Sequence, residues 1–175
     1  MDYFEIEGKN QLFGDITVSC AKNAVLPLMA ASILNDKPLT ISNVPKLSDS
    51  ITMGNLIEEM GGKVSFDHSN ITINPKNLNT PYAPYKLVKT MRASFYVLGP
   101  LIAKFGEAKV SLPGGCAWGP RPVDFHIDGL KKLGVEITLE AGYVIAKTKK
   151  MIGNKIVFPK ISVGATGNVL MAAVL

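Results

Sequence analysis

Apolar and polar positions alternate along the first 75 residues with two different periods, which predicts an ordered series of helices and strands. The predicted elements are, in order, a strand at 15–21, a strongly apolar helix at 23–34, a strand at 38–44, a helix at about 48–60, and a hairpin at 63–67 and 70–74. Pro27 falls in the first turn of the apolar helix, where a proline is tolerated. Ser48 or Asp49 can cap the second helix, and Gly61-Gly62 ends it.

The same order of elements recurs further along the chain. The second set comprises an apolar helix at 91–102, a strand at 108–112, a helix at 122–133 ended by Gly134, and a hairpin at 135–139 and 143–148. Ile41 aligns with Val110 at an offset of 69 positions, whereas Met60 aligns with Leu133 at an offset of 73. The second copy is therefore about four residues longer between its strand and its following helix. An insertion in one connection of a repeated scaffold indicates an added function.

A third copy begins near Ile156. The run at 170–173 repeats the run at 28–31 (LMAA) at an offset of 142 positions, although chance similarity between two apolar helices is the alternative. The order of elements predicts an α/β fold with one repeat domain over residues 15–175. Its units cover about 15–75 and 85–149, with an incomplete third unit at about 155–175, and the proline-bearing segment 75–89 joins the first two.

Composition narrows the class of protein. A hydrophobic content of 47% with 19% charged residues is typical of a globular domain with a sizeable core. The net charge of +5 is scattered, which favours a small anionic ligand at least as readily as nucleic acid. The two cysteines lie far apart, no secretory leader precedes them, and no stretch is long and apolar enough to span a bilayer. We therefore expect a cytoplasmic protein that binds neither nucleic acid nor a membrane.

The candidate chemistry centres on Ser111–Asp128 (SLPGGCAWGPRPVDFHID), where a cysteine lies within a run of prolines and glycines. Such a loop is costly to order and buries little apolar surface, so it seldom persists for stability alone. Arg121 and adjacent helix ends would lower the pKa of the Cys116 thiol and make it reactive, as would Lys22 if it lies beside them. The alternative is a long connection with an incidental thiol. We interpret Cys20, in an apolar segment, as a small core residue.

The repeat also aligns the polar residues at the start of each first helix. Lys22-Asn23 aligns with Met91-Arg92, and the third copy offers Gly164-Ala165 with free backbone amides. Helix amino termini favour anions, so these corners would form one anion-binding pocket if the copies surround a common axis. The alternative is that Lys22 and Arg92 are ordinary solvated side chains. By default we interpret Asp124 as a helix cap and His126 as a surface histidine with satisfied hydrogen bonds.

Four segments closely resemble the UDP-N-acetylglucosamine enolpyruvyl transferases. They are AKNAVLPLMAA, TMRASFYVLGPLIAKFG, LPGGCAWGPRPVDFHIDGLKKLG and KISVGATGN, in the family's order and covering essentially the whole chain. The resemblance implies an inside-out α/β barrel of two domains, each with three βαβαββ units, in which residues 1–14 pack with the second domain. It implies a transferase that places the enolpyruvyl group of phosphoenolpyruvate on the sugar 3′-hydroxyl and releases phosphate, in the first committed step of peptidoglycan synthesis. The resemblance also implies that no metal or cofactor is required.

The resemblance also implies roles for individual residues. Cys116 matches the loop cysteine that is proposed to protonate phosphoenolpyruvate, can form a covalent adduct with it, and is alkylated by fosfomycin. The residues that match phosphoenolpyruvate contacts are Lys22, Asn23 and Arg121. Those that match UDP-sugar contacts are Arg92, Arg121, Pro122, Val123, Asp124, Phe125, Lys160, Ser162, Val163 and Gly164. Further family residues, including the aspartate base, have no counterpart in these 175 residues, so we expect this chain by itself to lack transferase activity.

Two competing interpretations stay open. One is the related enolpyruvyl transferase of the shikimate pathway, whose loop lacks such a cysteine, so that the Gly-Gly-Cys sequence argues against it. The other is a non-catalytic repeat module that binds an anion or a partner protein, which can also describe the behaviour of an isolated fragment of an enzyme. Reaction of Cys116 with fosfomycin would discriminate between a transferase and such a module.

Overall fold

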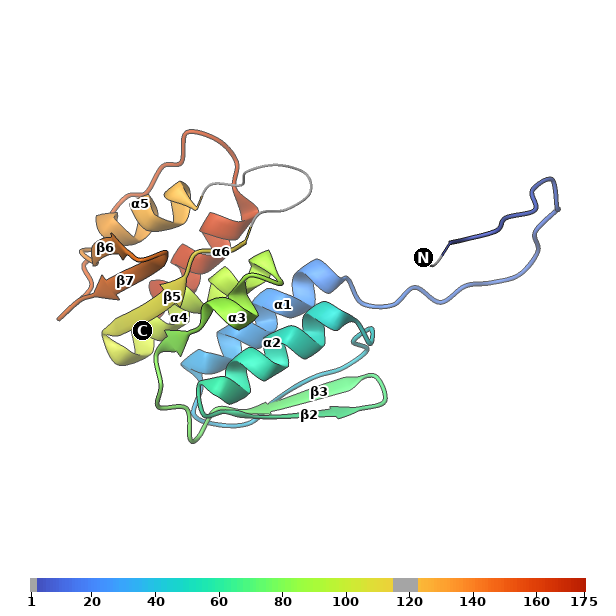
Figure 1. Cartoon of the computed structure of the whole chain (residues 1–175), viewed down its shortest axis with the longest axis horizontal. Helices are drawn as coiled ribbons and strands as arrows, with labels where there is room; N and C mark the ends of the chain where they lie inside the picture. Colours follow the sequence, from blue (N-terminus) through green and yellow to red (C-terminus); the bar gives the residue numbers. More distant parts are fainter. Residues whose placement is uncertain (1–2, 115–122) are drawn as a thin grey trace.

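The computed structural model describes residues 3–114 and 123–175. The first set of elements comprises α1 (Lys22–Ala31), the 3-10 helix η1 (Ser32–Leu34), β1 (Leu39–Ile41), α2 (Ser48–Glu59), β2 (Lys63–Asp67) and β3 (Asn70–Asn74). The second set comprises β4 (Tyr82–Ala83), α3 (Tyr85–Val88), the 3-10 helix η2 (Arg92–Val97), α4 (Leu98–Phe105), β5 (Glu107–Ser111), α5 (Asp124–Lys132), β6 (Glu136–Glu140) and β7 (Tyr143–Lys147). A last helix, α6 (Val163–Ala172), follows (Figure 1).

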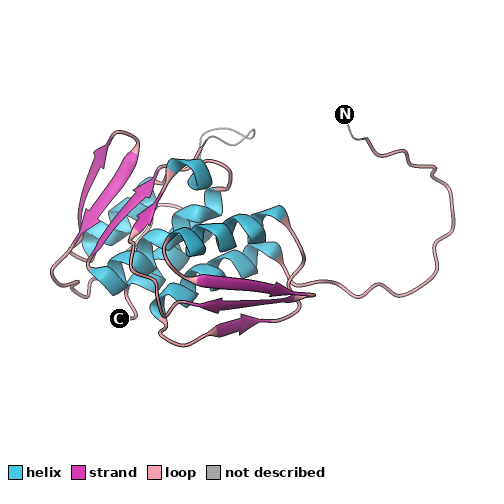
Figure 2. Cartoon of the chain, turned by 60° about the horizontal axis from the view of Figure 1, so that its bottom comes forward, coloured by secondary structure: helices cyan, strands magenta, loops and turns pink. Residues whose placement is uncertain are grey.

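Helices occupy the centre of the molecule and sheets cover its outside. The first sheet has the strand order β1-β3-β2 and the second has the order β4-β5-β7-β6. Figure 2 shows the two sheets at different edges of the body, with the helices between them. Side chains such as Met29, Met53, Phe95 and Leu101 are fully buried in the core between these layers. Because the sheets lie outside a helical centre, the arrangement agrees with the predicted inside-out α/β class.

The strand registers show the internal repeat directly. In the first sheet Ile41 of β1 lies opposite Ile71 of β3, and in the second sheet Val110 of β5 lies opposite Val144 of β7. These partners differ by the offsets of 69 and 73 positions that align the two copies of the sequence. The two hairpins are likewise 73 positions apart along their whole length, with β2 matching β6 and β3 matching β7. The additional residues of the second copy therefore lie between β5 and α5.

The hairpins and the helix ends follow the predicted turn chemistry. Gly61 and Gly134 lie at equivalent helix ends with φ of 99° and 84°, a conformation in which glycine meets no steric penalty. The two hairpin turns begin at equivalent residues, His68 and Ala141, with φ of 46° and 48°. This agreement between the copies indicates that turn geometry, and not only hydrophobic pattern, is repeated.

The strand predicted at 15–21 was wrong. Residues 3–19 form no helix or strand in the structure and run away from the body as a long exposed segment (Figure 1). Apolar side chains on this segment, among them Phe4 and Ile16, are 96% and 90% exposed. An alternating pattern becomes a strand only when a neighbouring strand satisfies its backbone groups. Among the described residues no strand pairs with this segment, and its end is tied down by a bond from Cys20 N to Asn43 O at 3.3 Å.

Several boundaries also differ from the predictions. Pro27 is the sixth residue of α1 and so lies in its second turn, beyond the first-turn position that the sequence predicted. The residue before α2 is Leu47, which makes Ser48 and Asp49 the first two helical residues and not the cap. The helix predicted at 91–102 begins as η2 and becomes α-helical only at Leu98. Cys20 is partly exposed and packs against the edge of the core, so its prediction as a core residue was only partly right.

None of the helices in the described part of the chain is long and apolar enough to cross a membrane.

Candidate anion-binding site at the helix amino termini

The amino-terminal ends of several helices face the same part of the molecular surface. Figure 1 shows α1, α2, α5 and α6 beginning at the upper and right-hand side of the body, toward the side from which the exposed amino-terminal segment leaves. Each helix start has backbone N–H groups without helical partners and a partial positive charge. Helix starts on one side of the molecule favour anions, so the anion-binding pocket that the repeat predicts stays a prediction.

Lys22, the first residue of α1, is held by an acidic side chain from the next helix. Its Nζ lies 2.8 Å from Oδ2 of Asp49, and the two side chains are 45% and 30% exposed. Asn23 follows on the exposed side of the same helix turn. The ion pair positions the ammonium group at the starts of α1 and α2 while leaving much of it in contact with solvent. A small anion can therefore approach Lys22 without disrupting the core.

Arg92, the first residue of η2, is exposed, and its positive charge acts on two rings, those of Tyr96 and His126. Burial raises the pKa of the Tyr96 hydroxyl, and the positive charge of Arg92 opposes that shift. Burial and then Arg92 lower the pKa of His126 from 6.5 to about 4. His126 is therefore a neutral ring at pH 7, next to a permanent positive charge.

The corner before α6 is formed by Ser162, Val163 and Gly164. Ser162 is the helix cap, and its Oγ accepts a hydrogen bond from Ala165 N at 3.2 Å. Gly164 lies close to the side chain of His126 from α5: a Cβ atom on Gly164 would be 3.2 Å from Nε2 of His126. The predicted residues of this corner therefore adjoin the histidine that sequence reasoning placed on the surface. Lys160 is exposed two residues before the cap.

The start of α5 lies beside the segment that leads to this corner. Phe125 stacks against Phe158 with ring centroids 6.0 Å apart, and a cavity of about 280 Å³ opens between α5 and residues 156–159. Val123 is buried at the residue before the helix, and Asp124 is the exposed first helical residue. Asp124 makes no capping bond, so its predicted role as a cap was wrong. As an acidic residue in the first turn it still complements the helix dipole.

His126 is buried, with 6% of its surface exposed, so its prediction as a surface histidine was wrong. Its Nδ1 lies 3.0 Å from Nδ2 of Asn168, a fully buried residue of α6. The ring of Phe95 meets the imidazole edge-on at 5.2 Å between centroids. Sequence reasoning missed this pair. The sequence signal for this pair is a single asparagine within the otherwise apolar run of α6. A buried amide seldom lacks partners, so this asparagine indicates a polar contact with a neighbouring element.

Cys116, Arg121 and Pro122 lie outside the described residues. The remaining predicted residues divide into three groups by position: Lys22 and Asn23 at α1, Arg92 at η2, and Val123, Asp124, Phe125, Lys160, Ser162, Val163 and Gly164 around the starts of α5 and α6. Gly164 lies close to the His126 ring, and the charge of Arg92 acts on the same ring. The second and third groups are therefore near one another. The roles of individual residues stay predictions.

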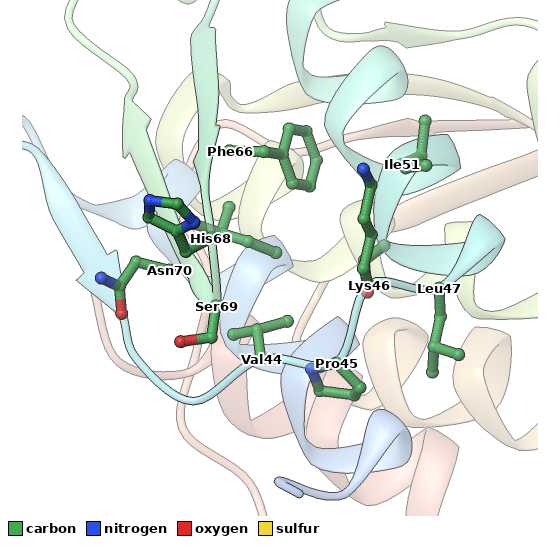
Figure 3. A pocket seen from close by; sticks show the side chains of 11 residues that line it. Val44, Pro45, Lys46, Leu47, Ile51, Phe66, His68, Ser69 and Asn70 are labelled. Atoms are coloured by element: carbon green, nitrogen blue, oxygen red, sulfur yellow. The ribbon is translucent and has the colours of Figure 1, made fainter.

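A further cavity of about 190 Å³ lies elsewhere, between the loop before α2 and the β2–β3 hairpin. Figure 3 shows the Lys46 side chain extending between Phe66 and Ile51 at its wall. Ser50 also lines it, and the Oγ atom of this buried residue has no hydrogen-bond partner among the described residues. None of the predicted site residues that the structure describes lines this cavity, so it is separate from the corner at α5 and α6.

Comparison with known proteins identifies the class. The protein-family model described as EPSP synthase (3-phosphoshikimate 1-carboxyvinyltransferase) matches residues 6–175. The chain therefore belongs to this family of enolpyruvyl transferases. Two solved structures share the fold: the enolpyruvyl transferase NikO from Streptomyces tendae, with a TM-score of 0.71 and 23% identity, and EPSP synthase from Acinetobacter baumannii, with a TM-score of 0.65 and 17% identity. They cover 82% and 91% of this chain, which in turn covers 32% and 37% of theirs.

Curated relatives point to one member of the family. The chain is 53% identical to the UDP-N-acetylglucosamine 1-carboxyvinyltransferase of Koribacter versatilis, 51% to that of Chlorobium limicola and 52% to that of Baumannia cicadellinicola. Each match covers the whole of this chain and 41%, 42% and 42% of the relative. The resemblance found in the sequence is therefore confirmed, and the chain spans about two fifths of the length of these relatives.

Proposed function

We propose that this chain supplies one part of an enzyme that transfers the enolpyruvyl group of phosphoenolpyruvate to the 3′-hydroxyl of UDP-N-acetylglucosamine. One observation carries the proposal: identity of 51–53% over the entire chain to relatives that are named for this reaction. The remaining part of the active site comes from sequence outside these residues, and residues 1–14 pack against it. The reaction is the first committed step of peptidoglycan synthesis, and its setting is the cytoplasm.

The proposed reaction is an addition followed by an elimination. Cys116 protonates the methylene carbon of phosphoenolpyruvate while the sugar hydroxyl oxygen bonds to the neighbouring carbon and loses its proton to a base, which gives a tetrahedral ketal. Loss of a proton from the new methyl group and cleavage of the carbon–oxygen bond to phosphate then form the enolpyruvyl ether. Cations that meet the phosphate and the positive charge developing beside it are expected to act most strongly in the transition state.

The geometry of the helix starts supports the proposed division of substrates. Lys22 is an exposed ammonium group held in place by Asp49, which suits the phosphate and carboxylate of phosphoenolpyruvate together with Asn23 and Arg121. The capped corner at Ser162 and Gly164 offers backbone N–H groups, which suit the diphosphate of the UDP-sugar. Lys160 lies two residues before this cap, and Arg92 lies at the equivalent corner of the second copy of the repeat. Pro122, Val123, Asp124 and Phe125 would hold the remainder of the nucleotide.

Fosfomycin labelling tests the proposal. A polypeptide of the relatives' full length that includes this chain is incubated with fosfomycin and analysed by mass spectrometry. We expect a single adduct on Cys116 that disappears in Cys116→Ser and persists in Cys20→Ser, because the partly buried Cys20 has no comparable setting. The same wild-type protein should release phosphate from phosphoenolpyruvate only when UDP-N-acetylglucosamine is present. Absence of both the adduct and phosphate release would overturn the proposal.

A further inference from the structure

The side chain of Asn168 bridges two backbone groups of the neighbouring helical segment. Its Oδ1 accepts from Gly99 N at 2.6 Å, and its Nδ2 donates to Phe95 O at 3.0 Å. Phe95 and Gly99 are four residues apart, which is the spacing of one α-helical hydrogen bond. The side-chain amide therefore bridges these two groups at the point where η2 becomes α4, and Phe95 O also accepts a bond from Leu98 N. Because Asn168 is fully buried, these partners satisfy groups that would be costly to leave unpaired.

These two bonds fix the orientation of the amide. A backbone N–H can only donate, so the atom facing Gly99 is the oxygen, and a backbone carbonyl can only accept, so the atom facing Phe95 is the nitrogen. The second hydrogen of Nδ2 is then directed at Nδ1 of His126, 3.0 Å away. Nδ1 must accept this bond, which leaves the ring proton of neutral His126 on Nε2. Burial and the nearby Arg92 keep the ring neutral by lowering the pKa of His126 to about 4.

The protonated nitrogen faces the corner before α6. A Cβ built on Gly164 would lie 3.2 Å from Nε2 of His126 and 3.8 Å from the Tyr96 hydroxyl. Among the described residues Nε2 has no hydrogen-bond partner. The Nε2–H group is therefore available to a ligand that occupies the corner formed by Ser162, Val163 and Gly164.

We propose that Asn168 is a positioning residue that holds His126 as the Nε2–H tautomer, so that His126 donates a hydrogen bond to a phosphate of the nucleotide at the α6 corner. The ligand assignment rests on the proposed function. A neutral donor at this position adds to the backbone N–H groups of the helix start without adding charge beside Arg92. Asn168 itself does not touch the ligand and acts only through the ring.

The tautomer is measured first, by long-range ¹H–¹⁵N NMR of the histidine rings in this chain. The sequence has only two histidines, and a His68→Gln variant assigns the signals. We expect the His126 ring to show the Nε2–H pattern at pH 7. The isosteric variant Asn168→Asp cannot donate to Nδ1, so its His126 ring should show protonation of Nδ1. An Nδ1–H pattern in the wild type, or an unchanged ring in folded Asn168→Asp, would overturn the positioning role.

Kinetics of the full-length protein then test the ligand contact. His126→Phe removes the donor and keeps an apolar ring in the cavity, so it should raise KM for UDP-N-acetylglucosamine about tenfold or more and leave KM for phosphoenolpyruvate nearly unchanged. Asn168→Asp should have a similar effect, and the double variant should be no worse than either single one. Equal effects on both substrates, or additive effects, would overturn the proposal. If the wild type transfers no enolpyruvyl group, the proposed function and this ligand assignment fail, whereas the NMR result still decides the tautomer.

Discussion

Lys22 and Asp49 form an ion pair that joins the first turns of two adjacent helices, with Nζ and Oδ2 2.8 Å apart. The pair connects residues 27 positions apart in the sequence. Because both side chains contact solvent, such a pair typically contributes no more than about 1 kcal/mol to stability. Its larger consequence is geometric, since it orients the ammonium group that we expect to bind phosphoenolpyruvate.

Asp49→Ala should therefore affect substrate binding more than folding. In the full-length protein we expect KM for phosphoenolpyruvate to rise about tenfold, because Lys22 loses the partner that restricts its rotamers. The free energy of unfolding should fall by less than about 1 kcal/mol. Asp36→Ala is the matched control, because it removes the similar pair between Lys104 and Asp36 at 3.1 Å, away from the predicted site residues. A KM that shifts equally in both variants would contradict a specific role for Asp49.

The buried His126 predicts how stability depends on pH. Its pKa is about 4 in the folded chain and 6.5 in the unfolded reference, so between these values the unfolded state binds a proton that the folded state does not. Stability should therefore fall as pH decreases through this window, by about 2 kcal/mol between pH 7 and pH 5 from this residue. Urea denaturation at the two pH values measures the change.

Two variants separate His126 from the other titrating groups. His126→Leu should remove most of this pH dependence, whereas His68→Gln should retain it because the His68 side chain is 95% exposed. A wild-type slope that survives in His126→Leu would mean that carboxylates, and not the buried imidazole, control stability in this range.

The repeat was predictable from the sequence because its signals are local. Strand alternation, two-residue turns and glycine helix ends each depend on residues close in the chain, and the two hairpins were predicted within a residue of their bounds. The corner at Gly164-Ala165 could also be predicted, because the repeat aligns it with Lys22-Asn23 and Met91-Arg92.

Other features depend on partners that are distant in the sequence. The segment 15–21 has the alternation of a strand, but whether it pairs depends on what lies beside it, and no described strand does. The contact between His126 and Asn168 spans 42 positions, so no local pattern could reveal that the histidine is buried. The same holds for Lys22, whose partner Asp49 the sequence suggested only as a helix cap.

The hairpin turn at Ala141-Gly142 predicts a pair of opposite effects. Ala141 has a φ of 48°, a left-handed conformation that costs an alanine about 1–2 kcal/mol relative to glycine. Ala141→Gly should therefore stabilise the chain by roughly 0.5–1 kcal/mol, after the greater entropy of glycine in the unfolded state is included. Gly142→Ala should destabilise it by about 1 kcal/mol, because Gly142 has a φ of 80°. Thermal unfolding of both variants checks the signs, and effects of the same sign would contradict the turn geometry.

The close approach of α4 to α6 predicts a severe effect at Gly99. A Cβ on this residue would collide with the backbone oxygen and the side-chain Oδ1 of Asn168, and a backbone atom cannot move aside without shifting the whole helix. It would also disturb the bond from Gly99 N to Oδ1 that anchors the Asn168 amide. Gly99→Ala should therefore lower the free energy of unfolding by about 3 kcal/mol, although alanine is the better helix former.

Gly153→Ala is the control, because a Cβ there meets nothing within 4 Å, and its unfolding free energy should change by less than about 0.5 kcal/mol. If Gly99→Ala unfolds at the same urea concentration as Gly153→Ala, α6 does not contact α4 as closely as described, and the positioning of His126 by Asn168 loses its support.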